Sequence, residues 1–128
     1  MITRINTVSV FVSDQARARD FYASVLGFEV LMDEPMGEGR WIQLAPKGAQ
    51  TSLVLMQPTE DMPAEVRERS RSLIGGFTNF IFAVDDLQAT YSELSTRGVE
   101  FPDKPSQQPW GWWATMKDPD GNVIGLHQ

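Results

Sequence analysis

The sequence predicts an α+β fold in which two βαβββ modules, related as an internal repeat, form a curved sheet around an open cleft. Three observations support this prediction: short segments in which polar and apolar residues alternate, two amphipathic helices that each follow such a segment, and a resemblance between the two halves of the chain. The chain has 128 residues, which suits one domain, and 41% of them are hydrophobic, as in ordinary globular proteins.

The first half reads as one strand, one helix and three further strands. Alternating side chains predict the first strand over Ile5–Val12. Ser13 is a suitable helix N-cap, Asp14 suits the positive end of the helix dipole, and Gly27 is a natural terminator. The three strands that complete this half are expected at Phe28–Asp33, Arg40–Ala45 and Ser52–Gln57.

The segment 58–76 differs in composition and reads as a linker. Pro63 can occupy the first turn of a short helix over Ala64–Arg69, and Gly75 with Gly76 ends the segment. We therefore expect one domain over residues 1–128, with modules at 1–57 and 77–128.

The second half repeats the pattern of the first. A strand is expected over Phe77–Val84, and a helix follows that Asp85 and Asp86 open and Gly98 closes. Strands are then expected at Val99–Phe101, Trp112–Lys117 and Val123–His127, with a loop at Pro102–Pro109. The segment Asp118–Asn122 predicts a tight turn, because its proline and glycine fit a turn and its glycine comes too early for a calcium-binding EF-hand loop.

The repeat can be counted along the chain. Val12-Ser13-Asp14 matches Val84-Asp85-Asp86 at an offset of 72, and Leu26-Gly27-Phe28 matches Arg97-Gly98-Val99 at an offset of 71. The order of the elements matches as well, which favours a true repeat over a chance similarity between two strand–helix units. Each helix would then cover one face of its sheet, and the opposite faces would line a cleft across a pseudo-twofold axis.

Several short motifs occur in the order found in one superfamily: Val12-Ser13-Asp14, Phe21-Tyr22, Val25-Leu26-Gly27-Phe28, Val84-Asp85-Asp86-Leu87, Arg97-Gly98-Val99 and Asp118-Pro119-Asp120-Gly121-Asn122. Together they resemble the vicinal oxygen chelate superfamily, which includes glyoxalase I, extradiol dioxygenases, fosfomycin-resistance transferases and bleomycin-resistance proteins. The resemblance spans nearly the whole chain. It implies paired βαβββ modules and a homodimer, but it does not imply one reaction.

Enzymes of this superfamily hold a divalent metal with His, Gln and Glu side chains on the first and fourth strands of each module. Counting from the matched motifs carries these positions to Thr7, Val54, Asn79 and Gly125. None of the four offers a carboxylate or an imidazole, which a divalent cation needs to offset its dehydration. A shift of one residue does not supply one, so we expect no metal and no cofactor.

Composition excludes other kinds of site. The chain has no cysteine, which excludes disulfides and thiolate chemistry, and its single histidine, His127, excludes sites built on several imidazoles within one chain. A net charge of −6 argues against a nucleic-acid partner. No segment approaches the roughly 20 apolar residues that cross a bilayer, and the N-terminus lacks the apolar run of a secretory signal. No membrane partner and a cytoplasmic location are therefore expected.

The cleft is the predicted ligand site, because alternation places neutral polar groups and aromatic rings on its walls. Either Trp112 or Trp113 should face the cleft, and Val54 and Gly125 should leave space there. His127 shares the face of Gly125 and could act as a base, bind a ligand or simply fray at the chain end. The tryptophans could equally be core or interface residues. The expected ligand-binding residues are Thr7, Ser9, Trp41, Gln43, Met56, Asn79, Trp110, Trp112, Trp113 and His127.

The sequence thus favours a metal-free protein that binds or sequesters an aromatic or amphipathic small molecule, as bleomycin-resistance proteins do. The alternative is a glyoxalase-like lyase or a dioxygenase-like enzyme with an atypical or absent metal site. A structural or regulatory module without a ligand is a third interpretation. No catalytic residue can be named from the sequence.

Overall fold

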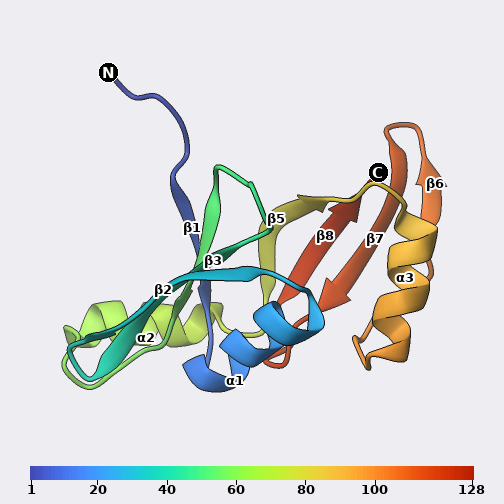
Figure 1. Ribbon diagram of the computed structural model, residues 1–128. Coiled ribbons are helices and arrows are strands. Elements are labelled where there is room, and N and C mark those ends of the chain that lie inside the picture. The colour runs from blue at the N-terminus through green and yellow to red at the C-terminus, as the bar shows by residue number, and fades with distance from the viewer. The chain divides into compact units, whose positions relative to one another are not determined.

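The computed structural model describes residues 1–128, and Figure 1 shows the elements along the chain. The chain divides into two compact units, Met1–Ile74 and Gly75–Gln128. Each unit holds a four-stranded mixed sheet together with a helix that follows its first strand. The predicted α+β fold with two βαβββ modules is therefore confirmed. No helix in the chain has the length and apolar character needed to cross a membrane.

The sheet of the first unit has the strand order β1-β4-β3-β2, in which β1 is parallel to β4 and the other pairs are antiparallel. The elements of this unit are β1 (Thr7–Phe11), α1 (Gln15–Asp20), the π-helical segment η1 (Phe21–Val25), β2 (Glu29–Met36), β3 (Gly39–Ala45), β4 (Ser52–Met56) and α2 (Ala64–Leu73).

The core of the first unit lies between α1 with η1 and one side of the sheet. Ala18 and Tyr22 of the helical segment are fully buried there, together with Ile42, Leu44 and Leu55 of the sheet. The N-cap of this helix lies one residue later than the expected cap at Ser13. Asp14 is the actual cap, because its carboxylate accepts a hydrogen bond from the Arg17 backbone N–H at 3.0 Å.

Two elements of the first unit are longer than predicted. Strand β2 continues through Pro35 to Met36. A proline has no backbone N–H to donate, but sheets tolerate it on an edge strand such as β2. The predicted linker contains α2, a ten-residue helix that extends beyond the expected end at Arg69 and contacts β1.

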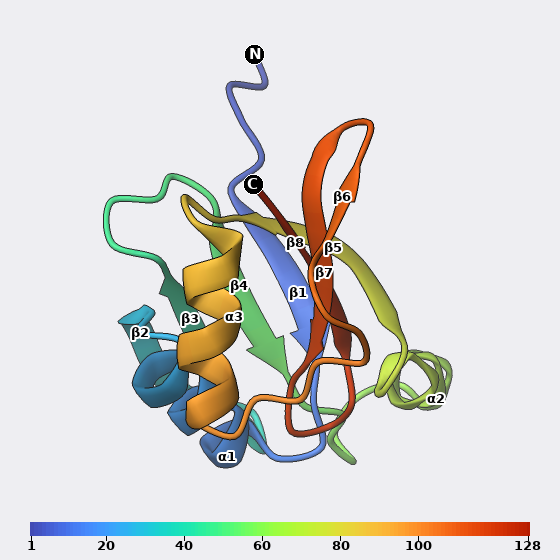
Figure 2. The same cartoon turned by 90° about the vertical axis from the view of Figure 1, so that its right-hand side faces the viewer.

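The sheet of the second unit has the strand order β5-β8-β7-β6, with β5 parallel to β8 and the other pairs antiparallel. Its elements are β5 (Phe77–Ala83), α3 (Leu87–Thr96), β6 (Ser106–Gln108), β7 (Gly111–Lys117) and β8 (Val123–His127). Figure 2 shows α3 standing beside the sheet that β7 and β8 form. The core here contains Leu87, Ala114, Met116, Ile124 and Leu126.

The edge of this sheet differs from the prediction. The expected strand at Val99–Phe101 forms only an isolated bridge between Glu100 and Lys117. The edge strand β6 lies within the segment that was predicted to be a loop, and it pairs with the start of β7 as a short hairpin. The predicted turn at Asp118–Asn122 is present, closed by the Gly121 N–H donating to the Asp118 carbonyl at 2.9 Å.

Candidate functional site

Strand register divides each sheet into a helix-covered side and an opposite side. Asp33 pairs with Ile42 and also contacts Arg19 of α1, so Ile42 and its alternating partners face α1. The opposite side is called face 1 here, and it carries Thr7, Ser9, Phe11, Trp41, Gln43, Ser52, Val54 and Met56. The sequence-predicted residues of the first module therefore share one face.

Face 1 contains a chain of hydrogen bonds that starts at an indole. Trp41 Nε1 donates to Gln43 Oε1 at 3.1 Å, and Gln43 Nε2 donates to Ser52 Oγ at 2.7 Å. The Ser52 hydroxyl in turn lies 3.4 Å from the Asn6 carbonyl. These hydrogen bonds fix the orientations of the Trp41 ring and the Gln43 amide. Alternation along the strand places both side chains on face 1, but it does not show that one donates to the other.

The second unit shows the same division. Gln128 reaches the N-terminus of α3, where its Oε1 accepts from the Leu87 N–H at 2.7 Å, so Leu126 and Ile124 also point toward α3. The opposite side is called face 2, and it carries Ile81, Ser106, Gln108, Trp113, Thr115, Lys117, Gly125 and His127.

Face 2 decides between the two adjacent tryptophans. Trp113 pairs with His127 and lies on face 2, whereas Trp112 takes the other side of β7, which is the side of α3. Trp110 is 62% exposed in the turn between β6 and β7. Of the three clustered tryptophans, only Trp113 therefore occupies the position predicted for a cleft-facing ring.

The space expected above Gly125 is filled. A Cβ atom placed on Gly125 would lie 3.1 Å from Cζ2 and Cζ3 of Trp113 and closer still to Cη2. The six-membered ring of the indole therefore rests directly on the Gly125 backbone. The sequence interpretation that Gly125 leaves room for a ligand is wrong. Gly125 pairs with Thr115 on β7, and the side chain of Trp113, two residues before Thr115 on that strand, covers the glycine. Val54 also leaves no open space, since it is 1% exposed.

His127 is tied into face 2. Its Nε2 lies 2.7 Å from the Trp110 carbonyl oxygen, which can only accept, so Nε2 carries the proton in this contact. The imidazole is half-buried and not a frayed terminus. Gly111 makes this contact possible: its φ is +123°, and a Cβ there would lie 3.0 Å from His127 Nε2.

Asn79 lies where β5 departs from regular pairing. The β5–β8 register shifts between Phe77 and Ile81, and Asn79 is the one non-glycine residue with a positive φ, at 66°. Asparagine tolerates this left-handed conformation better than most residues. The Phe80 N–H donates to the Thr78 hydroxyl at 3.1 Å, which supports the bulge, and the Asn79 side chain is exposed. Simple alternation could not predict this irregularity.

The side chains at the four positions that correspond to superfamily metal ligands do not fit a divalent cation. Thr7 and Asn79 offer only neutral oxygens, Val54 is buried and apolar, and Gly125 lies beneath an indole. Nowhere in the chain do three or more His, Cys, Asp or Glu side chains gather as a metal-binding group. The donor chemistry therefore argues against metal chemistry at the superfamily's usual position.

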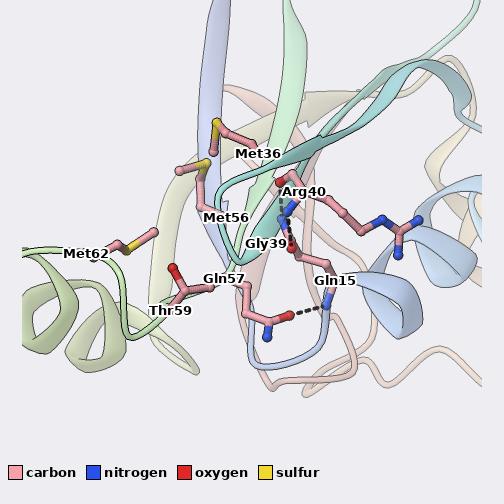
Figure 3. A pocket seen from close by; sticks show the side chains of 8 residues that line it. All are labelled: Gln15, Met36, Gly39, Arg40, Met56, Gln57, Thr59 and Met62. Carbon is pink, nitrogen blue, oxygen red and sulfur yellow. Dashed lines mark hydrogen bonds between the residues drawn. The ribbon is translucent and has the colours of Figure 1, made fainter.

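A small hollow lies at one end of the first sheet. Figure 3 shows Gln15 hydrogen-bonded to Gln57 and Arg40, with three methionine side chains around the same hollow. It has room for about one water molecule, so a drug-sized ligand does not fit there as the side chains stand. The residues that line it are Gln15, Met36, Gly39, Arg40, Met56, Gln57, Thr59 and Met62. Of these, the sequence pointed only to Met56.

The strongest electrostatic cluster of the first unit is structural. Asp33 accepts from Arg40 at 2.6 Å and from Arg19 at 2.7 Å, and the hydrogen bond from Arg40 is the main reason that the pKa of Asp33 lies below its usual value. These groups lie on the α1 side of the sheet, away from face 1. The carboxylate that does reach face 1 in register is Glu34, opposite Trp41 on the edge strand. Apart from Glu34 and the ion pair between Lys117 and Glu100 at 3.1 Å, faces 1 and 2 therefore offer aromatic rings and neutral polar groups.

Comparison with known proteins agrees with this arrangement. The model of the Glyoxalase/Bleomycin resistance protein/Dioxygenase superfamily matches residues 4–126. The "Uncharacterized protein YetH" of Bacillus subtilis (strain 168) is 38% identical, covering 100% of both chains. The crystal structure of TnmS3, described as an antibiotic binding protein from Streptomyces sp. CB03234, is 43% identical, covers 99% of this chain and 96% of its own, and has a TM-score of 0.83.

A more distant relative is an enzyme. The "Lactoylglutathione lyase" of Pseudomonas aeruginosa (strain ATCC 15692 / DSM 22644 / CIP 104116 / JCM 14847 / LMG 12228 / 1C / PRS 101 / PAO1) is 27% identical over 96% of this chain and 81% of its own. The chain has two βαβββ modules and the family model spans nearly its full length, so it belongs to the Glyoxalase/Bleomycin resistance protein/Dioxygenase superfamily.

Proposed function

We propose that this protein binds and sequesters a small aromatic or amphipathic molecule without a metal ion, using the residues of faces 1 and 2. The observation that carries the proposal is the composition of these faces. Each presents an indole, Trp41 or Trp113, beside neutral polar side chains. Aromatic walls with a few polar groups are typical of small-molecule sites.

The description of one similar protein supports a binding function. TnmS3 is described as an antibiotic binding protein and covers this chain almost completely. A binding function needs no acid–base pair. The assignment of Thr7, Ser9, Asn79 and the tryptophans to the ligand is part of this proposal.

The second candidate function is a lyase or dioxygenase activity, favoured by the relative described as a lactoylglutathione lyase. This candidate requires a catalytic centre other than the superfamily's metal position, because Val54 and Gly125 carry no donor side chain. The binding function explains the same residues without a further assumption.

We also propose that the protein is a homodimer. Exposed apolar side chains gather on the edge strand β2, where Val30, Leu31 and Met32 are 39%, 54% and 45% exposed, and on β5, where Phe77 and Ile81 are 51% and 58% exposed. Exposed apolar residues that recur along a strand mark interaction surfaces more often than isolated ones do. A second copy of the chain is the occupant that the superfamily resemblance favours.

The binding proposal can be tested with protein that has been dialysed against EDTA. A panel of planar aromatic antibiotics is titrated while tryptophan emission is recorded, and each compound is then recovered and analysed by mass spectrometry. We expect saturable quenching by at least one compound, recovery of that compound unchanged, and no effect of added zinc, nickel, manganese or iron. Conversion of a bound compound once metal is restored would instead support the enzymatic alternative.

A further inference from the structure

Trp41 and Trp113 occupy equivalent positions in the two modules. The pair Gln43–Val54 on β3 and β4 corresponds to Thr115–Gly125 on β7 and β8, at the repeat offsets of 72 and 71 residues. Counting two residues back from Gln43 and from Thr115 gives the two tryptophans. Both indoles are therefore attached at equivalent strand positions, on the side of their sheet opposite the helix.

The surroundings of the two indoles differ in hydrogen bonding. Trp41 Nε1 is occupied, because it donates to Gln43 Oε1 at 3.1 Å. In the second unit the position of Gln43 is taken by Thr115 and that of Ser52 by Val123, and the amide on the neighbouring strand, Gln108, donates to Ser106 Oγ at 3.0 Å instead of pairing with the indole. Trp113 Nε1 makes no hydrogen bond within the chain, and it is not sealed off from solvent. Only the second indole therefore has an N–H that a ligand can use.

The ring of Trp113 is nevertheless held in place. The atoms Cζ2, Cη2 and Cζ3, which form the outer edge of its six-membered ring, rest on the Gly125 backbone, which is buried beneath them. The pyrrole nitrogen belongs to the other ring of the indole. The contact with Gly125 thus fixes the ring through its apolar edge and leaves its donor unengaged.

His127 and Thr115 are polar residues near Trp113 on face 2, and they differ in whether their donors are available to a ligand. The His127 Nε2 proton is already donated to the Trp110 carbonyl at 2.7 Å, so that donor is unavailable. Thr115 lies two residues from Trp113 on the same side of β7, and its hydroxyl makes no hydrogen bond within the chain. Two unengaged donors, an indole N–H and a hydroxyl, therefore stand side by side on one strand.

We infer that Trp113 is the residue that determines ligand specificity on face 2, and that its Nε1–H donates to a carbonyl or similar oxygen acceptor attached to a planar ring. Trp41 contributes a ring surface but no donor. This inference rests on the proposed binding function and names the ligand class for it: planar aromatic compounds with an oxygen acceptor at the ring edge, in preference to the same ring without one.

The test uses two probes that differ only in the acceptor, 9-fluorenone and fluorene. Tryptophan labelled with ¹⁵N at the indole nitrogen gives four resonances, one for each tryptophan of the chain, and Trp→Phe variants assign them. With 9-fluorenone we expect the Trp113 N–H resonance to move downfield and its exchange with water to slow, while the Trp41 N–H keeps its hydrogen-bonded position. Fluorenone should bind about 3- to 10-fold more tightly than fluorene, the range of one net hydrogen bond.

Matched variants separate the donor from the ring. Trp113→Phe should bring the fluorenone-to-fluorene affinity ratio close to one, whereas Trp41→Phe should preserve the ratio. Gly125→Ala gives a second route, because the added methyl group displaces the Trp113 ring while the glycine has no positive φ to lose. We expect it to reduce the ratio as well, in protein whose circular dichroism and unfolding midpoint show that it is folded.

The outcomes distinguish this inference from the function on which it rests. Equal binding of both probes to the wild-type protein, or a ratio that survives Trp113→Phe, would overturn the inference and leave the binding function standing. A downfield shift at Trp41 instead of Trp113 would do the same. Failure of both probes to shift any indole resonance or quench emission would count against the binding of planar rings altogether.

Discussion

The two units of this protein use the same hydrogen bonds to build a module and different side chains to fill it. In the first unit the Asp14 carboxylate caps α1 at 3.0 Å, and in the second the Asp86 carboxylate caps α3 at the same distance. The backbone link from the first strand to the last also recurs, with Val12 N–H donating to the Met56 carbonyl as Val84 N–H does to that of His127, at 2.9 Å each.

A glutamine after the last strand of each unit completes the common frame. Gln57 Oε1 accepts from the backbone N–H of Gln15 at 2.9 Å, and Gln128 Oε1 accepts from that of Leu87 at 2.7 Å. These contacts join the start of the helix to the end of the sheet. They depend on backbone groups that any residue supplies, so the helix residues themselves are free to diverge.

The first helical position shows how far that divergence goes. In the first unit it is Gln15, which is 4% exposed. Its amide makes three further hydrogen bonds to the strands: Nε2 donates to the carbonyls of Arg40 and Leu55, and Oε1 accepts from the Arg40 N–H. In the second unit it is Leu87, which is fully buried among apolar side chains. The same junction is thus stabilised by polar contacts in one unit and by packing in the other. Each of the following predictions tests that contrast.

The largest effect is expected from truncating the apolar junction. Leu87→Ala removes a fully buried leucine, and such changes lower the free energy of unfolding by about 2–5 kcal/mol. Urea unfolding measures the loss, and hydrogen exchange should show it first in α3, β7 and β8. A loss below about 1 kcal/mol would mean that the second unit does not depend on packing at this position.

A smaller effect is expected at the polar junction. Gln15→Leu keeps the size of the side chain but leaves the Arg40 N–H and the Arg40 and Leu55 carbonyls without their partner, which should cost about 1–3 kcal/mol. Hydrogen exchange should localise the loss to β3, β4 and α1. Were the leucine variant as stable as the wild type, the amide network would be dispensable and packing would suffice in both units.

The smallest effect on stability is expected from removing the charge of Asp33. The hydrogen bond from Arg40 lowers the pKa of Asp33, so the ionised carboxylate stabilises the folded state above its unfolded pKa of about 3.9. That stabilisation is lost as the pH falls through the lower, folded-state pKa. Asp33→Asn should therefore reduce stability at pH 6 and make little difference in strongly acidic buffer, as measured by urea unfolding across pH. A penalty that stayed constant with pH would show that the charge is not its source.

Much of this protein follows from local sequence. The helix caps, the glycines that end helices and the period-two alternation of the strands depend on residues close in the chain, so both modules and the two sides of each sheet could be predicted. The same alternation placed Thr7, Ser9, Trp41, Gln43 and Met56 together on face 1. It also showed that one of Trp112 and Trp113 must lie on the side opposite the helix.

Only the tertiary structure decided what those faces hold. That Trp113 rather than Trp112 takes face 2 depends on the register between β7 and β8, and that its ring covers Gly125 depends on the absence of a side chain on a neighbouring strand. The bulge at Asn79 arises from the cross-strand pairing of β5 with β8, and the hydrogen bond of Trp41 to Gln43 on the same strand arises from the rotamers of the two side chains. Sequence periodicity fixes which way a side chain leaves the backbone, but its neighbours across the sheet decide where it comes to rest and which of its polar atoms remain available.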